Sequence, residues 1–593
     1  MITIKTKKTK FNDNEDFYKF AINAIDRNFS GLKYNEKEKE FKPMRLIFQK
    51  EYNQSKLPRY DIKQCVKDNI IDKNARYLLL ISNGAISTYL LNVILTELNK
   101  DSLFYLGSTF KDDISKKDYS YIMLNKIITN IEKGTFLTLR NLDIIYPSLY
   151  DFFNQHYTYA GINNNKKYTR ISLGMINKPR ILVHNDFRMA ILIDDDNILT
   201  QEPPFLNRFE KHLISFDNLL TQSEKKLGDF IINLIDKMTS FNNSQHKSFI
   251  NISNQKLNCH KEEIYGLIYM LCKNGKEEKN AILAKIIEII VKTFSQDLIL
   301  FAQFSNQIDE PLLKNINSNY HQNNFTNINE YLRNINKIKK RKNIIYTFSR
   351  IHENIKLYIE DIDCPFIKGK INEKTIYENF VSKFQSQSMV ENLIMKFYGL
   401  SVEEDIKELE NKNVLIFKFG VEDTEHLNLI SHIIENIEKD VDEETLNSKL
   451  IFFIIHIKRI FKNEKNDAST EINNKNYISH LNEQYEQRFI DNLNAPKLKY
   501  KFMDVIGDKS NKHIFKEINL FNSFSDLIYE IYNTFQIENM KEFGQTSTEY
   551  INNVAQNFNN NSFAKNYIIE LSYKYIKTIP KSFRFILGKK RYM

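Results

Sequence analysis

Residues 187–213 have the sequence FRMAILIDDDNILTQEPPFLNRFEKHL, and this stretch decides the fold that we predict. It opens with an apolar strand, Met189–Ile193, and passes through an acidic turn, Asp194–Asp196. Two prolines follow and then Arg208, which the pattern places just before a helix. A planar guanidinium with five fixed donors suits phosphate oxygens, as in trans-acting arginine fingers. The residues leave a second interpretation open, in which Arg208 is a surface arginine paired with Glu210 or another carboxylate.

Upstream of this stretch, from residue 75, short apolar strands alternate with amphipathic helices. The expected elements are strands at Tyr77–Ile81, Leu103–Leu106 and Thr135–Leu139, helices at Ile86–Leu98, Tyr119–Glu132 and Ser148–Tyr157, and a hairpin at Tyr168–His184. This alternation predicts a parallel sheet that helices cover on both faces. Right-handed crossovers would bring the strand ends to one edge, where ligands of open α/β sheets usually lie.

Downstream of Arg208 the pattern turns helical and then returns to α/β. Apolar residues recur at helical spacing in Leu227–Met238, and a lid of helices is expected over 214–314. Further strands are expected at Ile344–Phe348, Val414–Phe419 and Leu450–His456, with a helix at Thr424–Ile437 before the last of them. The predicted domains are a helical N-terminal segment 1–74, an α/β domain 75–213, the lid 214–314, an Asn-rich linker 315–342, a second and smaller α/β piece 343–462, and a mostly helical region 476–593.

The sequence after the first expected strand lacks a phosphate-binding loop. Such a loop has the pattern GxxxxGK[ST], whose backbone N–H groups hold phosphates and whose lysine neutralises their charge. Residues 81–88 are ISNGAIST, with one glycine and no lysine. The third strand leads into Arg140, where an ATPase needs a magnesium-binding carboxylate, and Asp143 is expected to be a turn or capping residue. We therefore predict a degenerate domain that does not hydrolyse ATP by itself.

Composition and charge exclude several classes of protein. A chain of 593 residues with 42% hydrophobic and 27% charged residues is typical of several globular domains. The net charge of +10 is modest and the charges are interleaved, so no nucleic-acid partner is predicted. Four scattered cysteines suit a reducing compartment and predict no metal site. The sequence shows no secretory signal and no apolar run of membrane-spanning length, so a cytoplasmic location is expected.

Several motifs resemble the AAA+ region of the mysterin family of giant ring-finger AAA+ ubiquitin ligases. They are ARYLLL at 75–80, LRNL at 139–142, SLYDFFNQ at 148–155, HNDFR at 184–188 and PPFLNRFEKH at 203–212, with weaker pieces at 417–423 and 452–456. The resemblance is strong over 75–213 and patchy to about residue 530. It implies a degenerate AAA+ (P-loop NTPase-like) domain with a helical lid.

The resemblance also implies a ring of six AAA+ units in which only some units bind ATP. No cofactor is then expected in this chain, and neighbouring AAA+ units would hold ATP and Mg²⁺, with Arg208 as the candidate trans arginine finger. The expected partners are those units or the rest of a ubiquitin ligase, and the ubiquitin machinery. Ring-finger cysteines are missing here, so ligase and ATPase activity are attributed to the whole assembly. Two alternatives stay open: a free-standing, non-catalytic scaffold that binds a partner, and an autonomous ATPase with an unusual site.

Overall fold

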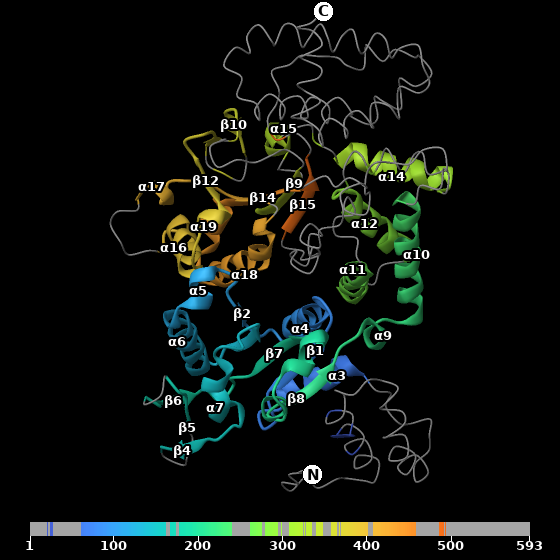
Figure 1. Ribbon diagram of the computed structural model, residues 1–593. Coiled ribbons are helices and arrows are strands. Elements are labelled where there is room, and N and C mark those ends of the chain that lie inside the picture. The colour runs from blue at the N-terminus through green and yellow to red at the C-terminus, as the bar shows by residue number, and fades with distance from the viewer. Residues whose placement is uncertain are drawn as a thin grey trace, which may run out of the picture. The chain divides into compact units, whose positions relative to one another are not determined.

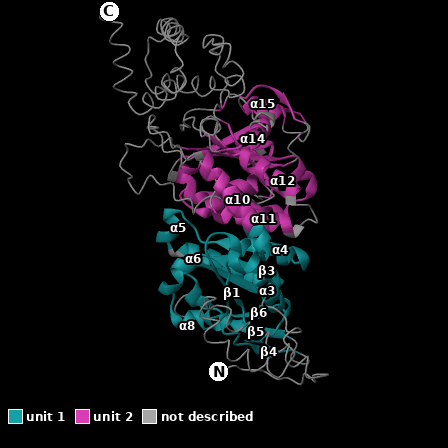
Figure 2. Ribbon diagram, turned by 90° about the vertical axis from the view of Figure 1, so that its right-hand side faces the viewer, with its two compact units in different colours: residues 1–225 teal, residues 226–593 magenta. Residues whose placement is uncertain are grey.

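The computed structural model divides the chain into two compact units, residues 1–225 and 226–593 (Figure 2). It describes residues 61–161, 166–173, 177–239, 261–274, 279–294, 308–323, 328–334, 340–347, 359–364, 369–400, 407–420, 422–457 and 485–490, with a few single residues such as 27, 325 and 357. Most of the predicted segment 1–74 and nearly all of 476–593 lie outside this description.

Unit 1 is built on a five-stranded sheet in which every strand runs parallel (Figure 1). Its strands are β1 (Leu78–Ser82), β2 (Ser102–Leu106), β3 (Phe136–Arg140), β7 (Met189–Asp194) and β8 (Glu210–Leu213), in the order β2-β3-β7-β1-β8. The β1 strand is buried along its whole length, which explains its continuous apolar sequence. The predicted parallel α/β fold is therefore confirmed.

Helices connect these strands. They are α3 (Ile62–Ile71), α4 (Ile86–Glu97), α5 (Lys111–Ser115), α6 (Lys117–Lys133), α7 (Tyr150–Phe153), α8 (Pro203–Leu206) and α9 (Phe216–Leu219). The first of them starts at Asp61, whose carboxylate accepts from two backbone N–H groups of the first turn. The long α6 ends at Gly134, which has a φ of 85° and so takes the left-handed conformation that glycine allows.

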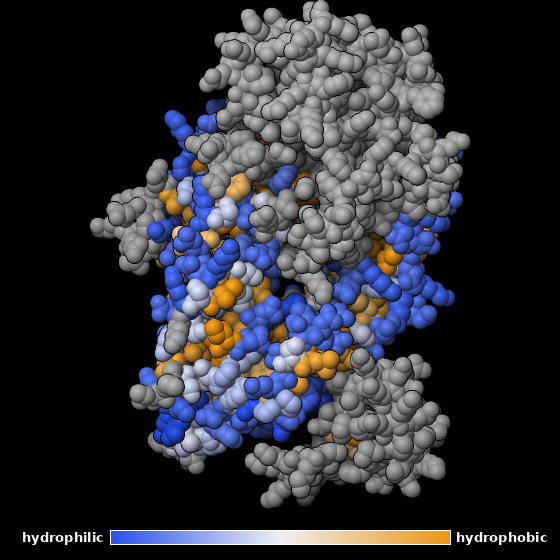
Figure 3. All heavy atoms as spheres, in the orientation of Figure 1, coloured by the Kyte–Doolittle hydropathy of each residue, from blue (hydrophilic) through white to orange (hydrophobic). Residues whose placement is uncertain are grey.

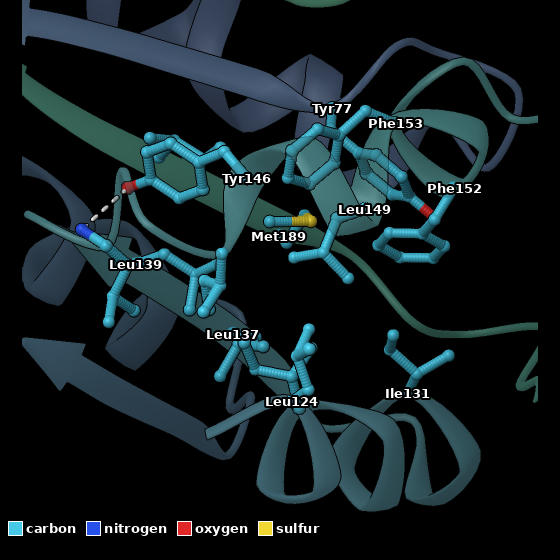
Figure 4. Close-up of a cluster of buried hydrophobic side chains, with 14 of the residues drawn as sticks. Tyr77, Leu124, Ile131, Leu137, Leu139, Tyr146, Leu149, Phe152, Phe153 and Met189 are labelled. Atoms are coloured by element: carbon cyan, nitrogen blue, oxygen red, sulfur yellow. Dashed lines mark hydrogen bonds between the residues drawn. The ribbon is translucent and has the colours of Figure 1, made fainter. Parts of the chain in front are cut away.

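Alternate residues of the strands point to one face and form the main core of unit 1. Odd-numbered residues of β1, β3 and β7 meet apolar side chains of α6 and α7 there. Figure 4 shows this cluster, in which Leu137 lies beside Leu124 of α6 and the Tyr77 ring lies next to those of Phe152 and Phe153. A closed aromatic group continues it, since the rings of Phe153, Phe205 and Phe209 lie 5.0 to 6.3 Å apart.

A small antiparallel sheet interrupts the path from β3 to β7. It consists of β4 (Thr158–Ala160), β5 (Lys166–Arg170) and β6 (Arg180–Val183), in that order, and extends the hairpin predicted from sequence. The helix expected at Ser148–Tyr157 is shorter than predicted: a 3₁₀ turn leads into α7, which stops at Phe153. The physical reason is Gln155, which has a φ of 55° and donates from its side chain to the Ala75 carbonyl.

The prediction of a helix directly after Arg208 is wrong. Residues Glu210–Leu213 form β8, which pairs in parallel with β1 in the register Leu78 with Glu210. The apolar pattern of these four residues, which include Glu210, Lys211 and His212, is too weak to predict a strand. The hydrogen bonds that β8 forms with the buried β1 determine the strand conformation.

Unit 2 contains a second five-stranded parallel sheet. Its strands are β9 (Lys342–Thr347), β12 (Ile376–Phe380), β13 (Val414–Phe419), β14 (Leu450–His456) and β15 (Tyr485–Phe489), in the order β12-β13-β14-β9-β15. When the strands are counted along the chain, both sheets have the order 2-3-4-1-5. The predicted second α/β piece is thus present, but it extends to β15, in a region that had been expected to be helical.

Helices precede and connect the second set of strands. They are α10 (Gln222–Thr239), α11 (Lys261–Asn274), α12 (Lys279–Val291), α14 (Glu310–Asn323), α15 (Ile328–Arg333), α16 (Gln387–Phe397), α17 (Lys407–Glu410), α18 (Leu427–Ile437) and α19 (Glu443–Asn447); a short hairpin, β10 (Ile362–Asp363) with β11 (Lys370–Ile371), lies between β9 and β12. The linker expected over 315–342 is replaced by α14 and α15 in its described part. Its many asparagines hid an apolar spacing, Ile316 with Tyr320 and Ile328 with Tyr331, that is buried.

Candidate functional site

The junction between β1 and α4 is the place where a P-loop would lie. Only residues 83–85 separate the end of β1 from the start of α4, and Gly84 has a φ of 66°. The buried Ser87 hydroxyl donates to the Ser82 hydroxyl at 2.6 Å, which ties the first turn of the helix to the strand. A phosphate-binding loop has four residues between its two glycines, so this turn is too short to form one.

The carboxyl ends of β3 and β7 are joined by an ion pair. The Arg140 guanidinium donates to the Asp194 carboxylate at 2.6 Å, and both side chains are less than one-third exposed. In a nucleotide hydrolase these strand ends supply carboxylate and polar groups for Mg²⁺ and the attacking water. Here the carboxylate of β7 is already neutralised by the arginine of β3. The first carboxylate of the acidic turn at Asp194–Asp196 is therefore engaged within the sheet.

Arg208, the candidate arginine finger, lies between α8 and β8. Its guanidinium carbon is 3.9 Å from the ring centroid of Tyr150, and one terminal nitrogen donates to the Pro204 carbonyl. The Tyr150 hydroxyl in turn donates to Glu202 at 3.4 Å. Within the described residues, the buried Nε of Arg208 has no hydrogen-bond partner. Tyr150 and Pro204 therefore hold the guanidinium flat against the domain.

The alternative pairing of Arg208 with Glu210 is not what the structure contains. Glu210 accepts two hydrogen bonds from Arg27 at 2.9 Å and is 3.0 Å from the buried ring of His212. Burial alone would raise the pKa of Glu210, but the hydrogen bonds and charges of His212 and Arg27 outweigh it and lower the pKa to about 2. Glu210 thus ties β8 to the N-terminal segment, and Arg208 contacts Tyr150 and Pro204 instead.

Arg188 is a buried structural residue of unit 1, a role that the sequence analysis did not assign to it. It is 3% exposed and donates to the Ala75, Asn69 and Arg76 carbonyls at 2.7 to 3.0 Å, and to the Asn69 side chain at 2.5 Å. Burial lowers the pKa of Arg188, and the nearby Tyr77 hydroxyl opposes that change. The HNDFR motif was the only signal for it. Its role could not be inferred because its partners are mostly backbone carbonyls.

The second sheet also carries an ion pair on its third strand. Lys418 of β13 binds the Glu378 carboxylate of β12 at 2.5 Å, and the two side chains are 4% and 16% exposed. The same carboxylate accepts from the Leu357 backbone N–H at 3.1 Å. The third strand of both sheets therefore carries a basic residue that is paired with a carboxylate of a neighbouring strand, Arg140 in one sheet and Lys418 in the other.

Metal sites and membrane-spanning helices are both missing from the part of the chain that the structure describes. The described residues contain no group of three or more His, Cys, Asp or Glu side chains that could hold a metal ion. None of the described helices is both long and apolar enough to cross a membrane.

Comparison with known proteins shows what the region around the first sheet is similar to. Residues 67–220 match the family described as the RNF213 AAA domain. The chain is 27% identical over 220 residues to the E3 ubiquitin-protein ligase RNF213 of Homo sapiens, covering 36% of this chain and 4% of that protein. The Mus musculus RNF213 is 30% identical over 156 residues, or 26% of this chain and 3% of that protein. The E3 ubiquitin-protein ligase rnf213-beta of Danio rerio is 31% identical over 215 residues, again 35% of this chain and 4% of that protein.

The match covers the elements that hold Arg140, Arg188 and Arg208. The predicted resemblance to mysterin (RNF213) is thereby confirmed for part of its AAA+ region. Residues 67–220 form an AAA module similar to that of RNF213, and the chain spans 4% or less of the relatives' length.

Proposed function

We propose that unit 1 is an AAA module without a nucleotide of its own that works inside a larger, RNF213-like ubiquitin ligase assembly. The observation that carries the proposal is the closed carboxyl edge of the sheet. The β1–α4 turn is too short for a phosphate-binding loop, and the Asp194 carboxylate is already bound by the Arg140 guanidinium. A parallel sheet of this type binds ligands at that edge, so loss of these groups removes the usual nucleotide site.

In this proposal Arg208 serves a nucleotide that a neighbouring AAA module holds. A trans-acting finger must sit on a rigid support and keep donors for phosphate oxygens. The Tyr150 ring and the Pro204 carbonyl provide the support, and the hydrogen bond to Pro204 uses one terminal nitrogen of the five-donor guanidinium. ATP hydrolysis and protein ubiquitination are assigned to the assembly, with ATP and Mg²⁺ bound by its other AAA units.

The test is the ATPase rate of the assembled ligase that contains this chain. Arg208→Ala should lower kcat by roughly 10³-fold, because trans arginine fingers contribute about 10³ to 10⁵ in rate. Arg208→Lys should recover only part of that loss, because an ammonium lacks the planar fork. The matched control is Arg333→Ala, which removes an exposed arginine of unit 2 paired with Glu360. Unchanged turnover in Arg208→Ala would refute the arginine-finger role.

A further inference from the structure

The small antiparallel sheet β4-β5-β6 lies in a stretch of one-sided charge. From Phe152 to Asn185 the sequence contains no aspartate or glutamate, whereas it contains five basic residues, namely Lys166, Lys167, Arg170, Lys178 and Arg180. The acids that flank the stretch are Asp151 and Asp186, and Asp186 is paired with Lys73. It is the longest stretch of the chain without an acidic residue.

The register of the sheet places three of these five charges, those of Lys166, Arg170 and Arg180, on one face. Side chains at alternate positions of a strand share a face, and directly paired residues face the same side. Thr169 of β5 and Ile181 of β6 are paired and buried, so they define the inner face. The outer face therefore carries Lys166, Tyr168 and Arg170 of β5 together with Arg180 of β6 and Thr158 of β4. In Figure 3 hydrophilic side chains gather at the lower left, over the region of β4, β5 and β6.

Two arginines stand directly opposite each other on this outer face. Arg170 pairs with Arg180 across β5 and β6, and like charges in such a pair destabilise a sheet. Arg180 turns back over the sheet, where it donates to the Thr158 hydroxyl at 2.6 Å and lies 5.6 Å from the Tyr168 ring centroid. Arg170 and Lys166 are both exposed and have no ion-pair partner among the described residues. No carboxylate of the described residues compensates the repulsion between these two arginines. Binding of an anion beside them would therefore relieve the repulsion.

We propose that the outer face of β4-β5-β6 binds an acidic, extended segment of a partner protein. Arginine forks match carboxylates with two parallel hydrogen bonds, and a strand with an acid at every second position would place all its carboxylates toward this face. Single-stranded nucleic acid fits less well, because it needs open aromatic rings on which bases stack. Tyr168 is the aromatic residue of the outer face, and the Arg180 guanidinium lies over its ring.

The experiment measures binding of a fluorescent peptide with glutamate at every second position to the whole 593-residue chain. The test variant is Lys166→Gln with Arg170→Gln, which removes two exposed charges from the outer face. The matched control is Lys111→Gln with Lys383→Gln, which removes two exposed lysines elsewhere. We expect the test variant to weaken the peptide roughly tenfold, as loss of two exposed ion pairs would, and the control variant to bind like the native chain.

The same titration with a glutamine-for-glutamate peptide and with a single-stranded RNA oligonucleotide completes the test. The neutral peptide should not bind, and the RNA should bind more weakly than the acidic peptide. Equal losses in the test and control variants would overturn the proposal, because they would show attraction by overall charge. Tighter binding of the RNA, dependent on Lys166 and Arg170, would overturn it in favour of a nucleic-acid surface.

Discussion

Arg188, just before β7, binds two short pieces of chain that lie more than 110 positions earlier in the sequence. Its donors reach the end of α3 at Asn69 and the residues Ala75 and Arg76 that lead into β1. The guanidinium is also 5.3 Å from the ring centroid of Tyr77, so it is enclosed on its apolar side as well. A cation buried in this way fixes the start of the central strand.

Replacing Arg188 with glutamine should therefore destabilise the chain strongly. The expected loss is roughly 3 kcal/mol of the free energy of unfolding, because buried acceptors would be left unpaired. Urea unfolding of unit 1, followed by circular dichroism, measures it. Arg170→Gln is the control and should change the free energy by less than about 0.5 kcal/mol, since Arg170 is exposed. Equal effects of the two substitutions would contradict the role assigned to Arg188.

Glu210 makes stability depend on pH in a defined direction. Its pKa is about 2 in the folded chain against an ordinary value of 4.5, so its carboxylate stabilises the folded state above the ordinary value. That contribution, about 3 kcal/mol at neutral pH, is lost as pH falls from 4.5 toward 2. Glu210→Gln should therefore be less stable than the native chain at pH 7, and the difference should shrink steadily below pH 5. A difference that stays constant between pH 7 and pH 3.5 in urea titrations would show that Glu210 is not the titrating group.

At the scale of elements, Gly134 joins α6 to β3 in a conformation that other residues strain. Its φ is 85°, and a Cβ at this position would lie 2.3 Å from Nδ1 of His184. Gly134→Ala should cost roughly 2 to 3 kcal/mol, the sum of backbone strain and the steric conflict. In a His184→Ala background only the backbone strain, about 1 kcal/mol, should remain. A double-mutant cycle by thermal unfolding tests this, and identical costs in both backgrounds would rule out the close contact.

The strands that could be predicted from the sequence differ in length and burial from those that could not. The strands β1, β7, β13 and β14 are continuous apolar runs because both faces of a parallel sheet are covered, so they could be predicted directly. The edge strand β8 could not, because two of its four residues are Glu210 and His212, whose polarity is satisfied by tertiary partners. The local pattern of apolar residues cannot predict such a strand, since its conformation is determined by pairing with β1.

The candidate site was predictable only in part for the same reason. The missing P-loop could be seen in the sequence, because that motif is contiguous. The pair between Arg140 and Asp194 could not, since the two residues are 54 positions apart and meet only through strand order. The support of Arg208 by Tyr150 likewise depends on residues from two separate motifs.

At the scale of the whole molecule, the chain contains two sheets with one strand order. In each five-stranded sheet the first strand lies between the fourth strand and the fifth, and the fifth forms the edge. A basic residue on the third strand binds a carboxylate of a neighbouring strand in both sheets. In both sheets the charge of the basic residue on the third strand is thus balanced by a carboxylate of an adjacent strand.

The central claim is that the sheet edge of unit 1 holds no nucleotide, and a titration tests it most directly. The purified 593-residue chain would be titrated with a fluorescent ATP analogue in the presence of Mg²⁺, followed by anisotropy and by calorimetry with unlabelled ATP. We predict no saturable binding at concentrations up to about 1 mM. Saturable binding of one nucleotide per chain, weakened by Asp194→Ala, would contradict the account, because it would show that the strand ends hold ATP despite the Arg140 pair.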